Sequence, residues 1–253
     1  LSADGVTSFT EPYISRDHTE RLFNYLGADI ETKGTTVTVK PSQLIAKDID
    51  VVGDISSAAF FIVAGLIVKE SDFIIKNVGI NPTRSGILDV VKRMGGGVEV
   101  INERIISGEP CADLRIQYND CLQGCVIEGS DIPRLIDELP VIAVLASQAE
   151  GETVVKNAED LRNKESDRIK CLVNELTKIV IDIKETPDGF IVTGKKTLAE
   201  ASIKSELESY HDHRLAMSFY IAGLVCNNEI AINGFEWTKI SFPEFENLIN
   251  LLL

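Results

Sequence analysis

The segment DLRNKESDR, residues 160–168, places two cations and an acid close together. Lys164 and Arg168 are four residues apart, so we expect them to share one face of a helix that begins here. Backbone N–H groups and the helix dipole favour negative charge at such a start, which predicts binding of a phosphate or carboxylate. Glu165 could act there as an acid or a base. The alternative is a solvated helix start with Glu–Lys–Arg pairs along the helix.

A second candidate is the motif His211-Asp212-His213-Arg214, which directly precedes an apolar stretch. Arg214 would enter the first turn of a buried helix, where a guanidinium needs an anionic partner or an aqueous cleft. The motif therefore favours an anion site. In the alternative, Asp212 is an N-cap with polar neighbours.

Three further residues could do chemistry. Asp137 in IPRLIDELPVIAVLA begins another apolar stretch, and it could either serve a site or only complement the helix dipole. Tyr13 and Arg16 in TEPYISRDHTE could contact a ring or a phosphate, although SRDHTE is also compatible with a helix cap.

An internal repeat predicts the elements that position these residues. Three times, a short β-type stretch runs through an asparagine into a polar loop, and a more polar helix with apolar positions three and four apart follows. An apolar helical stretch lies upstream each time, introduced by Asp54, Asp137 or Asp212. The asparagines are Asn77, Asn157 and Asn233.

The repeat predicts a mixed α/β (α+β) fold in which apolar helices pack against sheets. We expect three βαβαββ units in residues 53–253, with the starts of the helices at one end. Residues 1–52 match only the back half of such a unit, which predicts the remnant of a second, similar domain. Arg84 lies seven residues after Asn77, as Lys164 does after Asn157, but it lacks an adjacent acid and we expect it to be structural.

Composition restricts the class of function. The net charge of -14 and the absence of a Lys/Arg run argue against nucleic-acid binding. The apolar runs are shorter than the roughly 20 residues that span a membrane. Five cysteines without CxxC pairs favour a reducing cytosol and argue against a zinc site. The first residues contain neither an initiator Met nor a signal peptide, so we expect the chain to start in mid-protein.

Five motifs in this order, TEPYISRDHTE, GDISSAAFF, IPRLIDELPVIAVLA, LRNKESDRI and HDHRLAM, resemble the 5-enolpyruvylshikimate-3-phosphate synthase family, especially its bacterial glyphosate-tolerant branch. The resemblance implies two domains, each an inside-out α/β barrel of three units, with the active site between them. Residues 1–52 would end the shikimate-phosphate-binding domain, and residues 53–253 would form the carboxy-terminal barrel.

The resemblance also implies a transferase reaction in the shikimate pathway of aromatic amino acid biosynthesis. The 5-hydroxyl of shikimate-3-phosphate attacks C2 of phosphoenolpyruvate, and the tetrahedral ketal phosphate then eliminates phosphate. Asp137 and Glu165 match acid-base residues. The residues that match substrate ligands are Tyr13, Arg16, Lys164, Arg168, His213 and Arg214. No metal or organic cofactor is implied, and the complete enzyme would be a cytoplasmic monomer.

The chain departs from the family pattern in two places. Ile240 stands where many members have a phosphoenolpyruvate-contacting lysine, so the match of Lys239, one residue earlier, stays open. The family's amino-terminal substrate-binding residues have no counterpart here, so we expect this chain to be inactive without the missing amino-terminal part. The alternative hypothesis is an isolated, non-catalytic anion-binding domain of the same fold.

Overall fold

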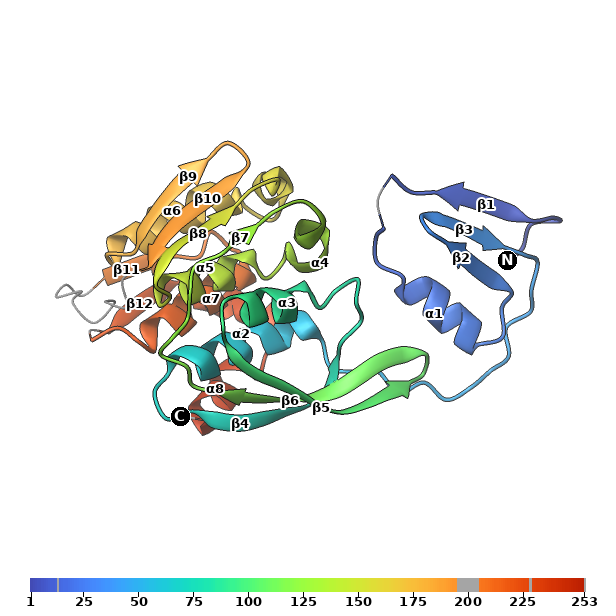
Figure 1. Ribbon diagram of the computed structural model, residues 1–253, viewed down its shortest axis with the longest axis horizontal. Helices are drawn as coiled ribbons and strands as arrows, with labels where there is room; N and C mark the ends of the chain where they lie inside the picture. Colours follow the sequence, from blue (N-terminus) through green and yellow to red (C-terminus); the bar gives the residue numbers. More distant parts are fainter. Residues whose placement is uncertain (13, 195–204, 228, 253) are drawn as a thin grey trace.

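The computed structural model describes residues 1–12, 14–194, 205–227 and 229–252 (Figure 1). The first part of the chain forms a small antiparallel sheet with strand order β1-β3-β2. Its strands are β1 (Thr7–Thr10), β2 (Ile30–Lys33) and β3 (Thr36–Val39), and helix α1 (His18–Tyr25) connects the first two. Gly27, with φ 92°, follows α1 in the left-handed conformation that glycine adopts readily, and it ends the helix there.

Residues 55–117 form the first of the three predicted units. Helix α2 (Ile55–Ile67) leads to strand β4 (Asp72–Gly79), then to helix α3 (Gly86–Arg93) and the hairpin of β5 (Gly97–Ile106) and β6 (Glu109–Gln117). Strand β6 lies between the other two strands and is antiparallel to both.

The second unit repeats this order of elements, and the third, among the described residues, repeats it only as far as its second helix. In the second, β7 and β8 pair in parallel and β10 pairs with β8 and β9 in antiparallel fashion; in the third, β11 and β12 are parallel. The elements of the second unit are β7 (Val126–Ile127), η1 (Gly129–Asp131), α4 (Ile132–Leu135), α5 (Leu139–Ser147), β8 (Gly151–Val155), η2 (Glu159–Asn163), α6 (Arg168–Lys178), β9 (Asp182–Thr186) and β10 (Gly189–Gly194). Those of the third are β11 (Ser205–Glu208), α7 (His213–Gly223), β12 (Ile230–Asn233), η4 (Phe235–Ile240) and α8 (Phe245–Leu252).

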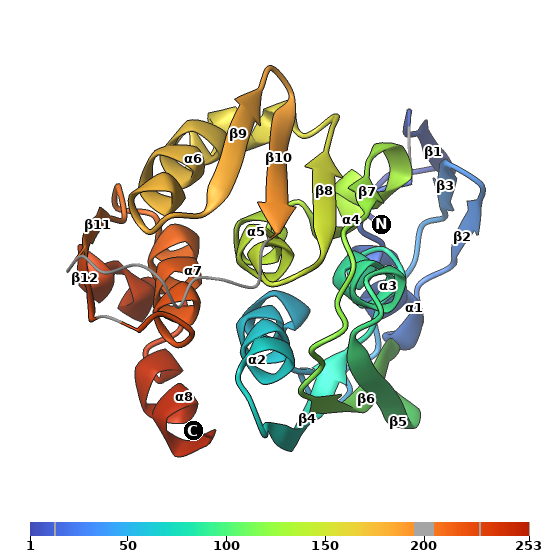
Figure 2. The same cartoon turned by 60° about the vertical axis from the view of Figure 1, so that its left-hand side comes forward.

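The three apolar helices α2, α5 and α7 lie in the middle of the molecule and the sheets lie outside them (Figure 2). Every residue of α5 is buried, and so is nearly every residue of α2. Helices that are apolar on all sides need neighbours on all sides, whereas α3 and α6, the second helices of the first two units, are amphipathic and pack against β5 and β9. The predicted inside-out α/β arrangement is confirmed.

The repeated asparagines have a structural role in two of the units. Asn77 and Asn157 are left-handed, with φ 58° and 56°, a conformation that Asn tolerates better than most residues. The backbone N–H of each donates to an aspartate carboxylate, Asp113 at 2.9 Å and Asp188 at 2.7 Å. Asn233 instead ends β12 as an ordinary strand residue.

Two predicted local structures are wrong. Helix α5 begins at Leu139, not at Asp137, because Pro140 occupies its first turn, where a missing N–H is tolerated. Lys164 and Arg168 do not share a helix face, since Asp167 caps α6 and Lys164 is extended before it. Both departures leave Asp137 and Lys164 on connecting segments.

Candidate functional site

Asp137 lies where the starts of α5, α6 and α7 meet, and cationic side chains surround its carboxylate. The nearest nitrogen atoms are Arg16 Nη2 at 3.0 Å, Arg168 Nη1 at 3.5 Å, Lys164 Nζ at 3.6 Å and Arg214 Nη2 at 3.8 Å. Burial raises the pKa of Asp137, but the charge of Arg214, the hydrogen bond from Arg16 and the charge of Lys164 outweigh it and lower the pKa to about 2. The carboxylate is therefore ionised at neutral pH.

Arg168 is buried next to Asp137 and is paired with the carboxylates of Asp212 and Glu165. Its side chain is 1% exposed, its Nε donates to Asp212 at 2.7 Å, and its Nη2 donates to Glu165 at 2.5 Å. The Asp212 carboxylate is fully buried and also accepts from Arg214 N at 2.9 Å and Leu215 N at 3.4 Å, so it caps α7, which was the alternative interpretation of this motif. A buried guanidinium that is paired in this way fixes the starts of α6 and α7 relative to each other.

His213 and Arg214 occupy the first turn of α7 and are only partly buried. Burial and then the charge of Arg214 lower the pKa of His213, so its ring is neutral at pH 7. The Arg214 side chain is 17% exposed, and its contact with Asp137 is the longest of the four. Arg214 thus retains donors that a bound anion could use.

The predicted site residues come from two separate parts of the chain. Arg16 reaches Asp137 from the loop between β1 and α1, and its own side chain is 44% exposed. Lys239 is exposed in η4. Tyr13 lies outside the described residues. The residues that the structure brings together are Arg16, Asp137, Lys164, Glu165, Arg168, His213 and Arg214.

Sequence reasoning missed Glu138, a carboxyl that is 2% exposed beside Asp137. The Ser56 hydroxyl donates to Glu138 and accepts from Arg84 Nη2 at 2.6 Å, which joins the starts of α2 and α5. Arg84 also contacts Asp54 at 3.3 Å, so it does have an acidic partner. Burial raises the pKa of Glu138, against the hydrogen bond from Ser56 and the charges of Arg84 and Arg214. The available signal was a second acid directly before a wholly apolar helix.

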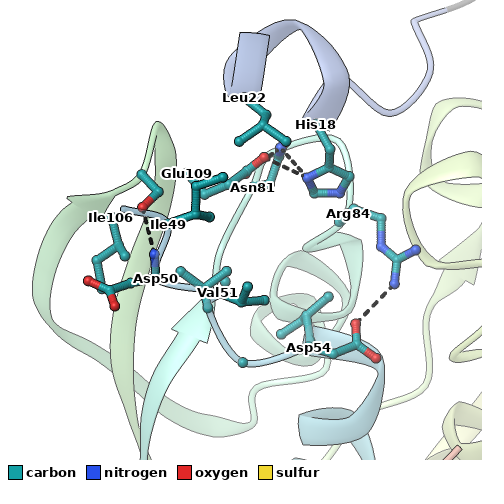
Figure 3. A pocket seen from close by; sticks show the side chains of 15 residues that line it. His18, Leu22, Ile49, Asp50, Val51, Asp54, Asn81, Arg84, Ile106 and Glu109 are labelled. Carbon is teal, nitrogen blue, oxygen red and sulfur yellow. Dashed lines mark hydrogen bonds and ion pairs between the residues drawn. The ribbon is translucent and has the colours of Figure 1, made fainter. Parts of the chain in front are cut away.

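A cavity of about 360 Å³ lies between α1, the segment 49–55 and the sheet of β4, β5 and β6, and Arg84 and Asp54 line it (Figure 3). It does not include Asp137. At its edge the buried Asn81 amide donates to Asp17 at 2.7 Å and to Glu109 at 3.0 Å, and His18 lies 2.7 Å from Glu109. These contacts join the small sheet unit to the rest of the chain.

Metal binding and membrane insertion receive no support from the described residues. Within the ranges that the structure describes, no group of three or more His, Cys, Asp or Glu side chains is placed to hold a metal ion. In those same ranges, no helix has the length and apolar character to cross a membrane. The cluster around Asp137 can instead bind anions and exchange protons through Glu165.

Comparison with known sequences gives a consistent family match. The profile of the family EPSP synthase (3-phosphoshikimate 1-carboxyvinyltransferase) matches residues 1–249. The chain is 49% identical to the 3-phosphoshikimate 1-carboxyvinyltransferase of Petrotoga mobilis over 250 residues, which cover 98% of this chain and 57% of that protein. It is 50% identical to the protein of the same name from Geotalea uraniireducens, again over 98% of this chain and 57% of the relative.

Solved structures agree with the sequence matches. The structure of EPSP synthase from Acinetobacter baumannii superimposes with a TM-score of 0.94 at 42% identity, covering 99% of this chain and 57% of that one. The enolpyruvyl transferase NikO from Streptomyces tendae superimposes with a TM-score of 0.75 at 20% identity, which indicates a shared fold. The chain therefore spans somewhat more than half the length of the proteins that it matches.

Proposed function

Because the chain belongs to the EPSP synthase family, we propose that it supplies one part of an enzyme that transfers the enolpyruvyl group of phosphoenolpyruvate to the 5-hydroxyl of shikimate-3-phosphate. The products are the enolpyruvyl ether and inorganic phosphate. The observation that carries this proposal is the ionised Asp137 carboxylate with four cationic side chains within 4 Å. A site for two phosphorylated substrates needs both kinds of charge.

We propose distinct roles for the two carboxylates. With a pKa of about 2, Asp137 is a weak base at neutral pH, and it suits the role of accepting hydrogen bonds from the shikimate hydroxyls. Glu165 is 48% exposed and bound to Arg168, so it can approach a substrate and transfer a proton at the enolpyruvyl methylene group. In the addition step the 5-hydroxyl oxygen would bond to C2, C3 would gain a proton from Glu165, and the hydroxyl proton would pass to solvent. In the elimination step C3 would return a proton to Glu165 as the C2–O bond to phosphate breaks, and the phosphate would leave.

The cations divide by exposure. Arg214 and Lys164 are partly exposed and contact Asp137 at 3.8 and 3.6 Å, which leaves them free to bind phosphate or carboxylate oxygens. Arg168 is buried and bound to Asp212 and Glu165, so we propose that it orients Glu165 and binds phosphoenolpyruvate only through its remaining Nη1 donor. Neutral His213 would donate a hydrogen bond beside the donor substrate, and Arg16 and Tyr13 would contact shikimate-3-phosphate.

We further propose that residues 1–52 and 53–253 belong to different domains. The strands β1, β2 and β3 pair only with one another among the described strands, and residues 41–52 contain no helix or strand. The segment ends at Gly53, which forms a parallel bridge with Val78 of β4. We expect the complete enzyme to be a cytoplasmic monomer whose substrates bind between the two domains.

Complementation tests the proposed activity. The chain is combined with the part of the Petrotoga mobilis relative that it does not cover, and release of inorganic phosphate from phosphoenolpyruvate is measured with and without shikimate-3-phosphate. We expect release only with both substrates. Glu165→Gln should lower kcat by about 10²-fold or more, the typical size of general acid-base catalysis, whereas the exposed Glu159→Gln should not. A folded complex without phosphate release would contradict the proposal.

A non-catalytic anion-binding domain is the second candidate, because Lys164, Arg168 and Arg214 all lie on this chain. It predicts that the chain alone binds phosphoenolpyruvate in calorimetry and that the complemented mixture releases no phosphate. Arg214→Ala should weaken such binding by roughly 10- to 100-fold, as expected for the loss of a charge-assisted hydrogen bond. Arg93→Ala, a change in an exposed arginine that contacts Asp131, is the matched control.

A further inference from the structure

The connection between β11 and α7 is a tight turn with an unusual backbone. Tyr210 and His211 are consecutive and both left-handed, with φ 54° and 60°. Residues other than glycine adopt this conformation uncommonly, a bulky tyrosine less readily than a histidine, and two in a row persist only where the surroundings determine them. The turn leads directly into Asp212, which caps α7.

Glu175 on α6 holds this turn from inside the protein. Its carboxylate is 1% exposed and accepts from Glu208 N at 2.8 Å, Tyr210 Oη at 2.9 Å and Lys178 Nζ at 2.6 Å. Burial, followed by the hydrogen bond to Glu175, raises the pKa of Tyr210 to about 12, so the hydroxyl remains a donor at physiological pH. One buried carboxylate thus binds both the beginning of the turn and its first left-handed residue.

Two contacts hold the turn on its other side. The Ser209 hydroxyl donates to the Gly234 carbonyl oxygen at 3.2 Å, and the ring centroids of His211 and Trp237 are 4.8 Å apart. Because the turn is held on both sides, its end is fixed relative to α6. That end carries Asp212, whose bond to Arg168 is 2.7 Å long.

We propose that Glu175 and Tyr210 are positioning residues that set the place of Arg214, and with it the binding of the phosphoenolpyruvate carboxylate or phosphate. Neither residue reaches the cluster around Asp137. They act through the connection between β11 and α7, because Arg214 lies four residues after Tyr210 and in the first turn of α7. This role rests on the proposed function of the site.

Tyr210→Phe in the complemented enzyme tests the role, because it removes one hydroxyl and keeps the ring. We expect the KM for phosphoenolpyruvate to rise about fivefold or more, the size of one lost hydrogen bond, with the KM for shikimate-3-phosphate within about twofold. Tyr220→Phe is the matched control, since its hydroxyl bonds Asn250 on α8 at 3.0 Å. An unchanged KM for phosphoenolpyruvate, or equal rises for both substrates, would overturn the proposal.

Titration of the histidine rings by NMR gives a readout that needs no activity. The chain has three histidines, and burial beside Arg214 lowers the pKa of His213. If the turn positions this segment, Tyr210→Phe should move the pKa of His213 back toward its ordinary value, and Tyr220→Phe should not. If the pKa of His213 is unchanged in Tyr210→Phe, the positioning role is wrong, whatever the activity of the enzyme. If the unmodified complemented enzyme releases no phosphate, the proposed function is wrong.

Discussion

Asp137 and Glu138 are neighbours in sequence whose environments shift their pKa values in opposite directions. Asp137 faces cations and its pKa is lowered to about 2, whereas Glu138 is buried behind it and its pKa is raised by that burial. Their side chains leave the backbone in different directions, toward the cluster and toward Ser56. A single residue step therefore separates a charged group that faces cations from a buried group that is bonded to Ser56.

Acid unfolding should report the lowered pKa of Asp137. A carboxylate with a folded pKa below its unfolded value stabilises the fold above about pH 4, and this contribution is lost as the pH falls toward 2. Between pH 5 and pH 2 the free energy of unfolding of the unmodified chain should fall as Asp137 is protonated. In Asp137→Asn this fall should be smaller by about 1 to 2 kcal/mol, after allowance for solvent screening. Urea unfolding followed by circular dichroism measures this.

The exposed Asp4→Asn is the control for that measurement. It should reproduce the acid sensitivity of the unmodified chain. If Asp137→Asn has the same pH dependence as Asp4→Asn, the cations around Asp137 do not stabilise its charged form.

The candidate site was predictable from the sequence only for residues that occupy related positions in the repeat units. Asp137, Lys164 and Arg214 each had a purely structural alternative. Only the corresponding places of Asp137 and Asp212 in the repeat, with Lys164 in the adjacent loop, indicated that these residues meet. The burial of Arg168 was not predictable, because it depends on Asp212 from a different unit. Glu138 was missed because its partner Ser56 lies 82 residues away.

Helix starts are the elements that organise this site, and they are built in unequal ways. Asp54 caps α2 by accepting from Ser56 N and Ser57 N, both at 3.2 Å, and its carboxyl is 54% exposed. Asp212 caps α7 but also compensates a buried arginine. The same residue type in the same repeat position therefore contributes differently to stability.

Substitution of the two caps should separate these contributions. Asp54→Ala should lower the free energy of unfolding by about 1 kcal/mol, the usual value of an N-cap. Asp212→Ala should cost about 3 to 5 kcal/mol, because it leaves the Arg168 guanidinium buried with less compensation. Urea unfolding at pH 7 measures both.

Asparagine variants provide the matched comparison, since Asn also caps helices well. Asp54→Asn should hardly change the free energy of unfolding. Asp212→Asn should lower it by nearly as much as Asp212→Ala does. Equal costs at the two positions would mean that the Arg168 pair contributes nothing beyond the cap.

The elements themselves were largely predictable, because apolar and amphipathic periodicities are strong over eight or more residues. The boundaries were less so. Pro140 moved the start of α5 past Asp137, and residues 159–163 formed a separate 3-10 turn before α6. Local hydrogen bonding decides such ends, and the pattern of apolar residues does not encode it.

At the scale of the whole molecule, a few polar contacts connect the small sheet unit to the helices and sheets that follow. Arg16 bonds Asp137, and Asn81 bonds both Asp17 of the loop before α1 and Glu109 of β6. The intervening segment 41–52 has no regular structure. This junction was not predictable, because Asn81 appeared in the sequence only as part of a polar loop.

Asn81→Ala should loosen this junction without unfolding the rest. It removes the shared donor and leaves the Asp17 and Glu109 carboxylates facing each other, so the segment 41–52 should become more accessible. We expect trypsin to cleave at Lys47 several-fold faster, measured by mass spectrometry, with unchanged circular dichroism.

Asn119→Ala is the control, because the Asn119 amide donates to the Gly95 carbonyl oxygen and, among the described residues, makes no hydrogen bond with the small sheet unit. It should leave cleavage at Lys47 unaltered. Equal cleavage rates in the two variants would show that Asn81 does not restrain the small unit.

The convergence of cations on one carboxylate has a kinetic consequence in a chain whose net charge is -14. A doubly charged anion must first approach through a repulsive long-range field, and only near Arg214 and Lys164 does the local field attract it. The Debye length is about 10 Å at 0.1 M salt, so added salt weakens the distant repulsion before it weakens the partly buried attraction. Moderate ionic strength should therefore speed the encounter of such an anion with the cluster around Asp137, the opposite of ordinary electrostatic steering.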